Sequence, residues 1–550
     1  MSGEEVPNVG LHRGKRIAAY LAAPIFAAAL AVTNRGVCAQ TPAGAPASSQ
    51  PDQHFDILEY RVLGNSRLAV RAVEGAVYPY LGPNRDFAAV EQAKASLEKA
   101  YRVAGYGAVV VDIPEQRVGD DGVVRLRVTE GRLDRVRVKG ARYYSGRQIL
   151  AALPALQVGT SPNLPALQQQ LANLNAQTTD RTVTPILKAG PEPGTVDVDL
   201  AVRDNLPLHA SVEADDQYTA NTTPNRVSVA MSYDNLWQLN HTLSLQFQTA
   251  PADPSQAEVE SATYLLRSQD AQAPVWAFSY IHTNSDVAAV STLGVLGDGS
   301  IYGLRWVDPV LNSTAVSQTV TLGVDYKDFL ENVELAGSPG LATPVRYMNW
   351  SALYSGAWRT ADRTVSFTSG INFGMRGVVN QPYEFDSRRY GALPNYFYVR
   401  TSGQVSQLLP GGFAILARAT GQWSPTPLID DEQFSLGGSD TVRGYLVAET
   451  LGDDAAAGTL EVHSPVIGRA WGPQLNTFYG FLFGDAGIVG LEEPLPSQER
   501  RTDLGSTGVG LRMEGATGFQ GSLDWALPLV TGPYTRRGDS RIDFSVRYGF

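Results

Sequence analysis

The chain has 550 residues, of which 18% are charged and 43% are hydrophobic, and its formal net charge is −11. This length predicts two or more domains, and the acidic balance argues against a nucleic-acid-binding protein, because phosphate contact needs a basic surface. After the N-terminus, no stretch offers the roughly twenty consecutive apolar residues of a membrane helix. The composition fits a soluble protein and a transmembrane β-barrel equally well, because barrel strands alternate lipid-facing and lumen-facing residues.

The N-terminus has the pattern of a secretory signal peptide. Three basic residues precede an apolar run over residues 17–32, and small residues follow it up to Ala39. This order predicts a leader over residues 1–39 that is cleaved after Ala39. A membrane anchor is the alternative, but an Ala-rich run of this length with a central Pro fits a membrane span poorly. Because Cys38 is the only cysteine, the mature chain would have no disulfide, thiolate metal site or cysteine nucleophile.

Two copies of one supersecondary unit are predicted next, after a flexible, Pro-rich tail over residues 40–54. Both copies read β-α-α-β-β from their hydrophobic periodicity. The first copy covers residues 55–130, with strands at 55–62, 108–113 and 123–128 and helices at 67–77 and 87–104. The second covers residues 131–204, with strands at 133–138, 182–187 and 195–202 and helices at 145–153 and 164–175. A repeat of roughly 75 residues indicates tandem small domains; two unrelated α+β domains are the alternative.

From residue 208 to residue 550 the pattern changes to alternating segments without a convincing helix. In the last segment Ile542, Phe544, Val546, Tyr548 and Phe550 alternate with polar residues, which places them on one face of a strand. Sixteen segments are predicted, with alternately short and long connections. A soluble β-sandwich would alternate in the same way, but an even strand number and aromatic residues near segment ends favour a closed barrel in a membrane. These aromatic residues are Trp276, Tyr280, Trp306, Tyr396, Tyr398 and Phe550. The predicted fold class is therefore two tandem α+β domains followed by an all-β, 16-stranded antiparallel transmembrane barrel.

Two short motifs in the barrel region are candidates for a functional site. The longest stretch without alternation, residues 424–459, contains the sequence LGGSDTVRGY at 436–445. Its glycines permit backbone angles that a side chain would forbid. The predicted thirteenth strand contains Phe483-Gly484-Asp485-Ala486-Gly487, and Asp485 is predicted to point into the lumen.

Together these motifs resemble those of the two-partner secretion transporters, the TpsB-type haemolysin secretion/activation proteins such as ShlB, FhaC and HecB. The family belongs to the outer-membrane polypeptide-transport and assembly superfamily. Its loop-tip motif is matched by Val442, Arg443, Gly444 and Tyr445, and its motif on the wall of strand thirteen is matched by Phe483, Asp485 and Gly487. The resemblance covers about residues 55–550. It implies two polypeptide-transport-associated (POTRA) domains in the periplasm, a barrel in the outer membrane with the loop folded into it, and an ion pair between Arg443 and Asp485.

The resemblance also implies the partners and the activity. It predicts a transporter, not an enzyme, that secretes a large unfolded exoprotein (TpsA-like) through its barrel, without a cofactor or a nucleic-acid partner. The barrel would contact outer-membrane lipid, and Phe550 resembles the terminal aromatic through which such proteins reach the barrel-assembly machinery. Phe550 could equally be one more lipid-facing residue. Many relatives carry an N-terminal plug helix, for which residues 40–54 are too short and too rich in Pro.

Several alternatives remain open from the sequence. A barrel-assembly insertase of the same superfamily would have a similar barrel but usually three or more N-terminal domains, and a diffusion porin would need neither these domains nor the in-folded loop. The Arg443–Asp485 pair could control the conducting state or serve only as a structural clasp. Catalysis is not expected, because the sequence has no HExxH, P-loop or GxSxG motif and its histidines show no metal-ligand spacing. These histidines are His12, His54, His209, His241, His282 and His463.

Overall fold

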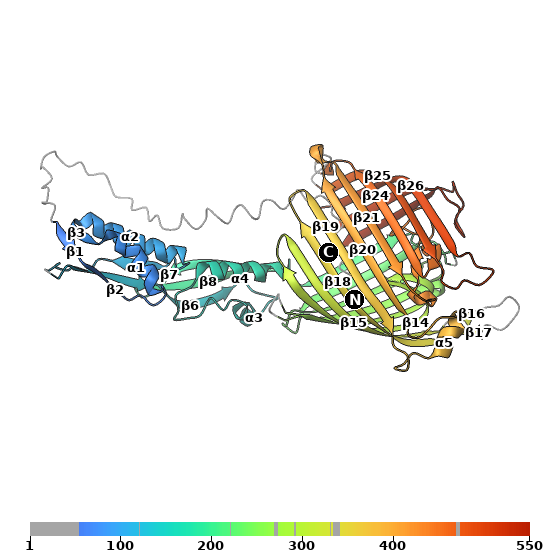
Figure 1. The fold of residues 1–550 in the computed structure, drawn as a ribbon, viewed down its shortest axis with the longest axis horizontal. Coiled ribbons are helices and arrows are strands. Elements are labelled where there is room, and N and C mark those ends of the chain that lie inside the picture. The colour runs from blue at the N-terminus through green and yellow to red at the C-terminus, as the bar shows by residue number, and fades with distance from the viewer. Residues whose placement is uncertain are drawn as a thin grey trace. The chain divides into compact units, whose positions relative to one another are not determined.

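The computed structural model describes residues 54–550 except 120, 221, 269–272, 291–292, 331, 334–340 and 469–473. The described residues form two compact units, and the chain passes from the first to the second between Leu206 and Pro207 (Figure 1). The predicted leader, and the predicted tail up to residue 53, lie outside the described residues. No helix in the described part of the chain combines the length and the apolar character of a membrane span.

The first repeat of the N-terminal unit is a β-α-α-β-β fold with one additional strand pair. Its elements are β1 (Phe55–Ile57), β2 (Glu59–Leu63), α1 (Val70–Val77), β3 (Gly82–Arg85), α2 (Phe87–Val103), β4 (Val109–Asp112) and β5 (Val123–Glu130). Strand β5 lies between β2, which is parallel to it, and β4, which is antiparallel. The strand predicted over residues 55–62 is two strands, because β1 leaves this sheet and pairs with β3.

Helix α2 shows why this segment folds as predicted. The Asp86 carboxylate caps the helix by accepting a hydrogen bond from the Ala89 backbone N–H, which satisfies one of the unpaired donors of the first turn. The buried side chains of α2 recur at helical spacing, and Val90, Leu97 and Tyr101 among them form one cluster with the sheet residues Val111 and Leu126. The buried side chains of α2 are Ala89, Val90, Ala93, Leu97 and Tyr101.

The second repeat has the same connectivity. Its elements are β6 (Arg132–Lys139), α3 (Gly146–Ala151), α4 (Leu164–Ala176), β7 (Arg181–Ala189) and β8 (Thr195–Asp204). The central strand β8 is parallel to β6 and antiparallel to β7, as β5 is to β2 and β4. Buried residues of α4, such as Leu167 and Leu171, lie in one cluster with Val198 and Leu200 of β8.

Hydrogen bonds join the two repeats directly. The Leu164 backbone N–H donates to the Gly105 carbonyl at 2.9 Å, and the Asn163 side-chain amide donates to the Ala104 carbonyl at 3.1 Å. The N-terminus of α4 therefore abuts the C-terminal end of α2, and the repeats form one compact unit.

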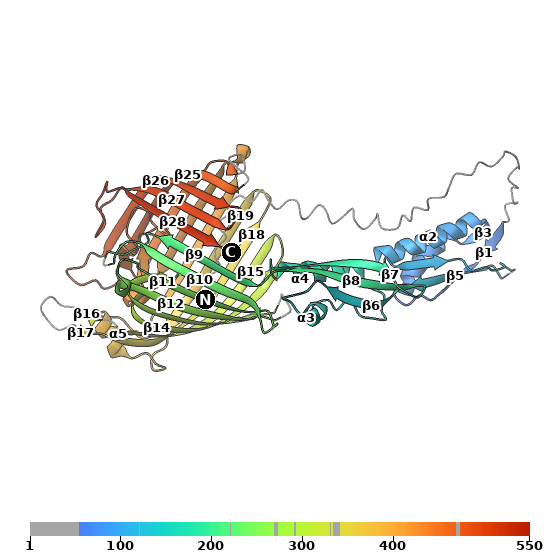
Figure 2. The ribbon, with the colours of Figure 1, turned by 180° about the vertical axis from the view of Figure 1, so that it is seen from behind.

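The second unit is a closed barrel of sixteen antiparallel strands (Figure 2). The strands are β9 (Leu208–Asp215), β10 (Arg226–Leu236), β11 (His241–Thr249), β12 (Ala257–Leu266), β13 (Val275–Val290), β14 (Leu293–Asn312), β15 (Val316–Leu330), β18 (Val345–Arg359), β19 (Arg363–Gly374), β20 (Phe397–Leu408), β21 (Ala414–Trp423), β24 (Asp454–His463), β25 (Leu475–Gly490), β26 (Arg501–Gly515), β27 (Phe519–Pro528) and β28 (Arg541–Gly549). Each strand pairs with its neighbours in the chain, and β28 closes the ring by pairing with β9. The predicted strand number and antiparallel order are confirmed.

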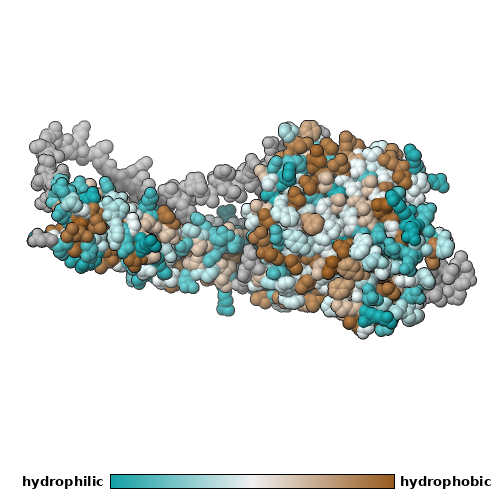
Figure 3. Space-filling model, in the orientation of Figure 1, coloured by the Kyte–Doolittle hydropathy of each residue, from teal (hydrophilic) through white to brown (hydrophobic). Residues whose placement is uncertain are grey.

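The barrel turns its apolar side chains outward and its polar side chains inward. On β28, Ile542 and Tyr548 are 58% and 48% exposed, whereas Asp543 is 4% exposed and lines a cavity inside the barrel. Figure 3 shows hydrophobic residues spread over the outer face of this unit. This arrangement suits a barrel whose outer surface contacts lipid.

The prediction that six aromatic residues lie on the outer surface near the strand ends is wrong for two of them. Trp276 is exposed, but Tyr396 and Tyr398 are buried and stack on each other with ring centroids 6.3 Å apart. The alternation of side chains explains the difference: Phe397, between them, contacts the exposed Trp423 instead.

Connections differ in length between the two ends of the barrel. At the end where β9 begins, turns such as 237–240, 313–315 and 360–362 are short, whereas the opposite end carries the loops 375–396 and 424–453. We call this opposite end the long-loop end. It also carries the small elements β16 (Asn332–Val333), β17 (Leu341–Ala342) and α5 (Pro382–Arg388), as Figure 1 shows.

Candidate functional site: a loop folded into the barrel

The loop between β21 and β24 is a hairpin, and its tip contacts inner-wall residues of the barrel. Its stem is formed by β22 (Phe434–Leu436) and β23 (Thr450–Gly452), which are antiparallel. Beyond the stem, a single antiparallel β-bridge pairs Gly438 with Val442 in the tip. The loop ends at residue 453, not at the predicted 459, because β24 already begins at Asp454. The Ala-rich start of β24 hides this boundary, since it has no contrast between apolar and polar residues.

Arg443 at the loop tip is bound to the wall residue Asp485 in two ways. Its Nε and Nη2 atoms donate to the two carboxylate oxygens of Asp485, each at 2.8 Å, and its backbone N–H donates to the same carboxylate at 3.1 Å. The side chains are 3% and 0% exposed. A bidentate contact fixes the orientation of the guanidinium as well as its charge, so the tip has one defined position against β25.

A second acid, which the sequence motifs do not indicate, also binds the Arg443 guanidinium. Nη1 of Arg443 donates to Glu461 on β24 at 2.8 Å, and the other Glu461 oxygen lies 2.7 Å from Nε2 of His463. The guanidinium also lies over the ring of Phe483, 3.6 Å from its centroid, a favourable cation–π position. The alternation of β24 could have shown that Glu461 points inward, but not which residue it meets.

Tyr445 ties the tip to two further strands. Its hydroxyl group lies 2.9 Å from the Gly505 carbonyl on β26 and 2.7 Å from the Val530 carbonyl just after β27. The ring is buried, so these contacts satisfy a polar atom that has no access to solvent. Val442, which is also fully buried, packs in a cluster with Leu436 and Val489. The tip is therefore held by polar and apolar contacts together.

The motif glycines allow the backbones to approach closely. Gly444 has a φ of +86°, and a Cβ atom there would lie 2.9 Å from Cβ of Ala526. On the wall, a Cβ atom at Gly487 would lie 2.5 Å from Leu436 and 3.2 Å from Val442. Glycine is therefore needed at both positions, at the first for its backbone angle and at both for space.

A polar cavity of about 680 Å³ lies beside the tip. Its lining includes Gly438 and Asp440 from the loop and the facing wall residues Ser228, Gln246 and Gln248. These side chains offer hydrogen-bond donors and acceptors but little apolar surface, so the space suits water and polar backbone groups better than an apolar ligand.

Phe550, the predicted assembly signal, lies at the barrel end opposite the long loops. Its backbone N–H donates to the Ala210 carbonyl at 3.0 Å, and its carbonyl accepts from the Ala210 N–H at 3.1 Å. The side chain is exposed and its ring contacts Tyr548. The residue thus extends the seam between β28 and β9, with its ring outside.

Comparisons with protein families match both units. The haemolysin secretion/activation protein family ShlB/FhaC/HecB matches residues 194–513, which is more than half of the chain. A POTRA domain of the ShlB type matches residues 55–131. The first repeat is therefore a POTRA domain.

Curated relatives are outer membrane transporters named CdiB. The chain is 25% identical over 416 residues to CdiB of Escherichia coli O6:K15:H31 (strain 536 / UPEC), an alignment that covers 71% of this chain and 66% of the relative. It is 23% identical over 425 residues to CdiB of Dickeya dadantii (strain 3937), covering 73% of this chain and 71% of the relative. The alignment thus spans just under two thirds of the first relative.

Solved structures share the fold. CdiB from Escherichia coli matches with a TM-score of 0.60 at 18% identity, covering 93% of each chain. BamA from Haemophilus ducreyi, in a form that lacks POTRA domains 1–3, matches with a TM-score of 0.57 at 13% identity, covering 90% of this chain and 100% of that one. The closed barrel and the POTRA domain place the protein in the outer membrane, with the POTRA domain in the periplasm. The chain belongs to the ShlB/FhaC/HecB family of haemolysin secretion/activation proteins.

Proposed function

We propose that the protein secretes a large, unfolded partner polypeptide through its barrel, as in two-partner secretion. The observation that carries this proposal is the loop tip bound to the inner wall through Arg443 and Asp485, in a chain whose barrel matches a secretion family. No nucleotide is available in the periplasm. The free energy for export would therefore come from folding of the partner outside the cell, which prevents its return.

In this proposal the N-terminal unit captures the partner. The second repeat serves as a second POTRA domain, because its sheet order and helix positions reproduce those of the first. Each main sheet has two outer strands, β2 and β4 in the first repeat and β6 and β7 in the second. An unfolded segment could add to such a strand through backbone hydrogen bonds, while side-chain contacts give selectivity.

The loop tip would set the conducting state. Arg443 and its two acids are almost fully buried, and a buried charge that loses its partner is strongly destabilising. The tip should therefore stay in one place until a competing interaction displaces it. Phe550 would act earlier, as the terminal aromatic presented to the barrel-assembly machinery.

Comparative proteomics tests the function. Culture supernatant and outer membrane are compared for the wild type, a deletion strain and the restored strain. We expect the deletion to remove one large secreted protein and to leave other outer-membrane proteins unchanged. A general decrease in outer-membrane barrels would instead identify an insertase, and no change in either fraction would indicate a diffusion porin.

A further inference from the structure

The part of the loop that precedes its stem is attached to a different wall of the barrel. We call residues 428–433 the loop root. Glu432, 1% exposed at its side chain, accepts hydrogen bonds from Nζ of Lys327 at 2.5 Å, from Tyr347 at 2.7 Å and from Tyr398 at 2.8 Å. These three donors come from β15, β18 and β20. One carboxylate thus joins the root to three strands that do not contact the tip motif.

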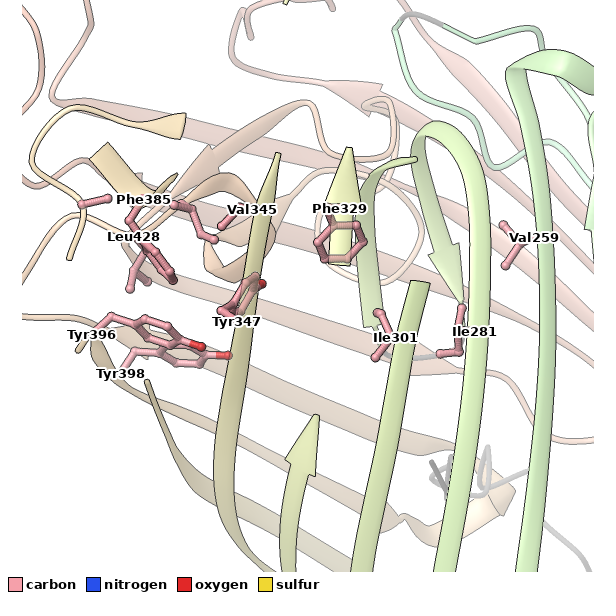
Figure 4. Close-up of a cluster of buried hydrophobic side chains, with 12 residues drawn as sticks. Val259, Ile281, Ile301, Phe329, Val345, Tyr347, Phe385, Tyr396, Tyr398 and Leu428 are labelled. Atoms are coloured by element: carbon pink, nitrogen blue, oxygen red, sulfur yellow. The ribbon is translucent and has the colours of Figure 1, made fainter. Parts of the chain in front are cut away.

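The root also fills an apolar space at the long-loop end. Leu428 and Ile429 are buried in one cluster with Phe385 of α5 and with inner-wall residues of β12, β13, β14, β15 and β18. Figure 4 shows Phe385, Leu428, Tyr396 and the wall residues Tyr347 and Tyr398 converging on this space. The root and α5 therefore cover part of the inner wall that the polar lumen would otherwise leave in contact with water.

Two adjacent arginines of loop 375–396 form ion pairs with acids of the loop root and with the acid that follows the hairpin stem. Arg388 donates to Asp430 at 3.0 Å and to Asp431 at 3.2 Å. Arg389 forms a bidentate pair with Asp453, a fully buried residue at the end of the hairpin stem. Loop 375–396 and the root are therefore bound to each other by charged contacts as well as by the apolar cluster.

The two attachments of the loop share no partner among the described residues. Arg443 and Tyr445 contact β24, β25, β26 and Val530, which follows β27. Glu432 contacts β15, β18 and β20. The stem formed by β22 and β23 separates them. Nothing in this geometry requires one attachment to break when the other does.

We propose that Glu432 is a positioning residue that holds the loop root and α5 as a lid over the long-loop end, and that this lid opens for the exported polypeptide in a step separate from displacement of the tip. The proposal rests on the proposed function, because it assigns opening to one half of the same loop. Opening would expose Lys327, Glu432 and their tyrosine donors to water, which can hydrate both charges. The lid can then open without leaving an unpaired charge in an apolar space.

Thiol labelling of intact cells tests the lid. Ile429 is 1% exposed, and the only natural cysteine, Cys38, lies in the predicted leader. An Ile429→Cys variant should therefore react slowly with a membrane-impermeant maleimide. In the Ile429→Cys/Glu432→Gln double variant, buried Lys327 loses its countercharge, and we expect labelling to become at least tenfold faster. Tyr398→Phe, which removes a single donor, should give a smaller increase.

Two controls make the result specific to the root. Asp440→Asn makes the same acid-to-amide change in the same loop, at an exposed tip residue, and should leave the labelling rate unchanged. Arg443→Ala should also leave Ile429→Cys protected, because the root does not depend on the tip. Heat-modifiable electrophoretic mobility verifies in every variant that the barrel is folded.

Three outcomes would overturn the proposal. They are equal labelling with and without Glu432→Gln in a folded barrel, fast labelling already in the Ile429→Cys protein, or fast labelling caused by Arg443→Ala. The assay needs no exported partner, so it separates failure of the lid from failure of the secretion function. A strain that secretes no partner but shows the expected labelling would refute the function and retain the lid.

Discussion

The N-terminal unit and the barrel use the same alternation of side chains for opposite surroundings. On β8, Val198 and Leu200 face the repeat's core, and Asp199 accepts hydrogen bonds from Lys139 and Lys188, whose side chains are more than half exposed. On β25, Leu482 faces outward and Asp485 faces inward to Arg443, with both charges buried. The same pattern of one apolar and one polar face therefore gives an ion pair whose lysines remain in water in one unit and a water-excluded ion pair in the other.

This contrast predicts how much each ion pair contributes to the stability of its unit. An exposed pair gains little, because water solvates its charges when they separate. A buried pair is costly to break from one side, because the remaining charge has neither partner nor water. Variants in both units test this contrast, and their expected effect decreases from Arg443→Ala in the barrel to Asp199→Asn in the N-terminal unit.

Arg443→Ala should have the largest effect, because it leaves both Asp485 and Glu461 buried without their cation. We expect a loss of about 3–5 kcal/mol in barrel stability, and at least a tenfold loss of secreted partner per folded barrel. Arg443→Lys should rescue only partly, since lysine cannot form the bidentate contact. The measurements are the heat-modification temperature of the barrel and the amount of partner in the supernatant.

A matched arginine gives the control for this variant. Arg418 on β21 lines the same cavity and makes no ion pair with another residue of the described chain, so Arg418→Ala should change neither quantity. Loss of barrel together with secretion would support a structural clasp, and loss of secretion alone would support control of the conducting state. If Arg443→Ala changed nothing, both roles would be wrong.

Gly487→Val should come next. Its side chain would overlap Leu436 and Val442 of the loop, and overpacking of this kind typically costs about 1–3 kcal/mol. Gly484→Val on the same strand is the control, because a Cβ atom there meets nothing within 4 Å. The heat-modification temperature should fall for the first variant only. Equal behaviour of the two would show that the loop does not pack against β25.

Tyr445→Phe should have a moderate effect. It removes only the hydroxyl group that contacts the Gly505 and Val530 carbonyls, and losing such hydrogen bonds costs about 1–3 kcal/mol in a buried setting. The ring and its packing remain, so secretion should decrease less than in Arg443→Ala. A decrease as large as that of Arg443→Ala would mean that the hydroxyl group, and not the ion pair, fixes the tip.

Asp199→Asn should have the smallest effect. Hydrogen bonds from Lys188 and Lys139 lower the pKa of Asp199 to about 2, below the value of about 3.9 in an unfolded chain. The carboxylate therefore contributes stability that is fully present above about pH 4 and is lost as the pH falls towards about 2. The difference between wild type and Asp199→Asn should be constant from pH 7 to pH 5 and shrink below pH 4.

Urea unfolding followed by helical circular dichroism measures this difference, because α1, α2, α3 and α4 lie in the N-terminal unit. The barrel should resist urea and contribute a constant signal. A difference that grew as the pH fell would contradict the assigned pKa direction. A destabilisation as large as that of Arg443→Ala would contradict the contrast between the two units.

The sequence was sufficient for the strands and for the contact between the two motifs. Alternation alone located sixteen strands, because lipid outside and polar space inside impose opposite requirements on successive residues. The Arg443–Asp485 contact followed from the family resemblance and is present in the structure. The boundary at Asp454 is not visible in the sequence, because the Ala residues that follow it remove the contrast between apolar and polar residues on which alternation depends.

Glu461 and Glu432 could not be assigned from the sequence for a different reason. Alternation shows that a residue of a strand points inward, but its partner depends on strand register and on the path of a long loop. Glu432 meets Lys327 across 105 positions of sequence, and no local pattern links the two. The misplacement of Tyr396 and Tyr398 has the same origin, because aromatic residues near strand ends also serve to pack a loop inside the barrel.

The loop, through its two attachments, connects two arcs of the barrel and restricts their movement relative to each other. Its hydrogen bonds fix β15, β18 and β20 relative to β24, β25 and β26. Within the described residues, neither these hydrogen bonds nor the apolar cluster of the root reaches β10 or β11, so this arc is the part of the ring that can flatten or widen most easily. Its inward residues near the cavity, such as Ser228 and Gln246, are polar and uncharged. The side of the barrel wall that deforms most easily is thus also the side whose inward residues near the cavity offer no charged group to hold a passing chain.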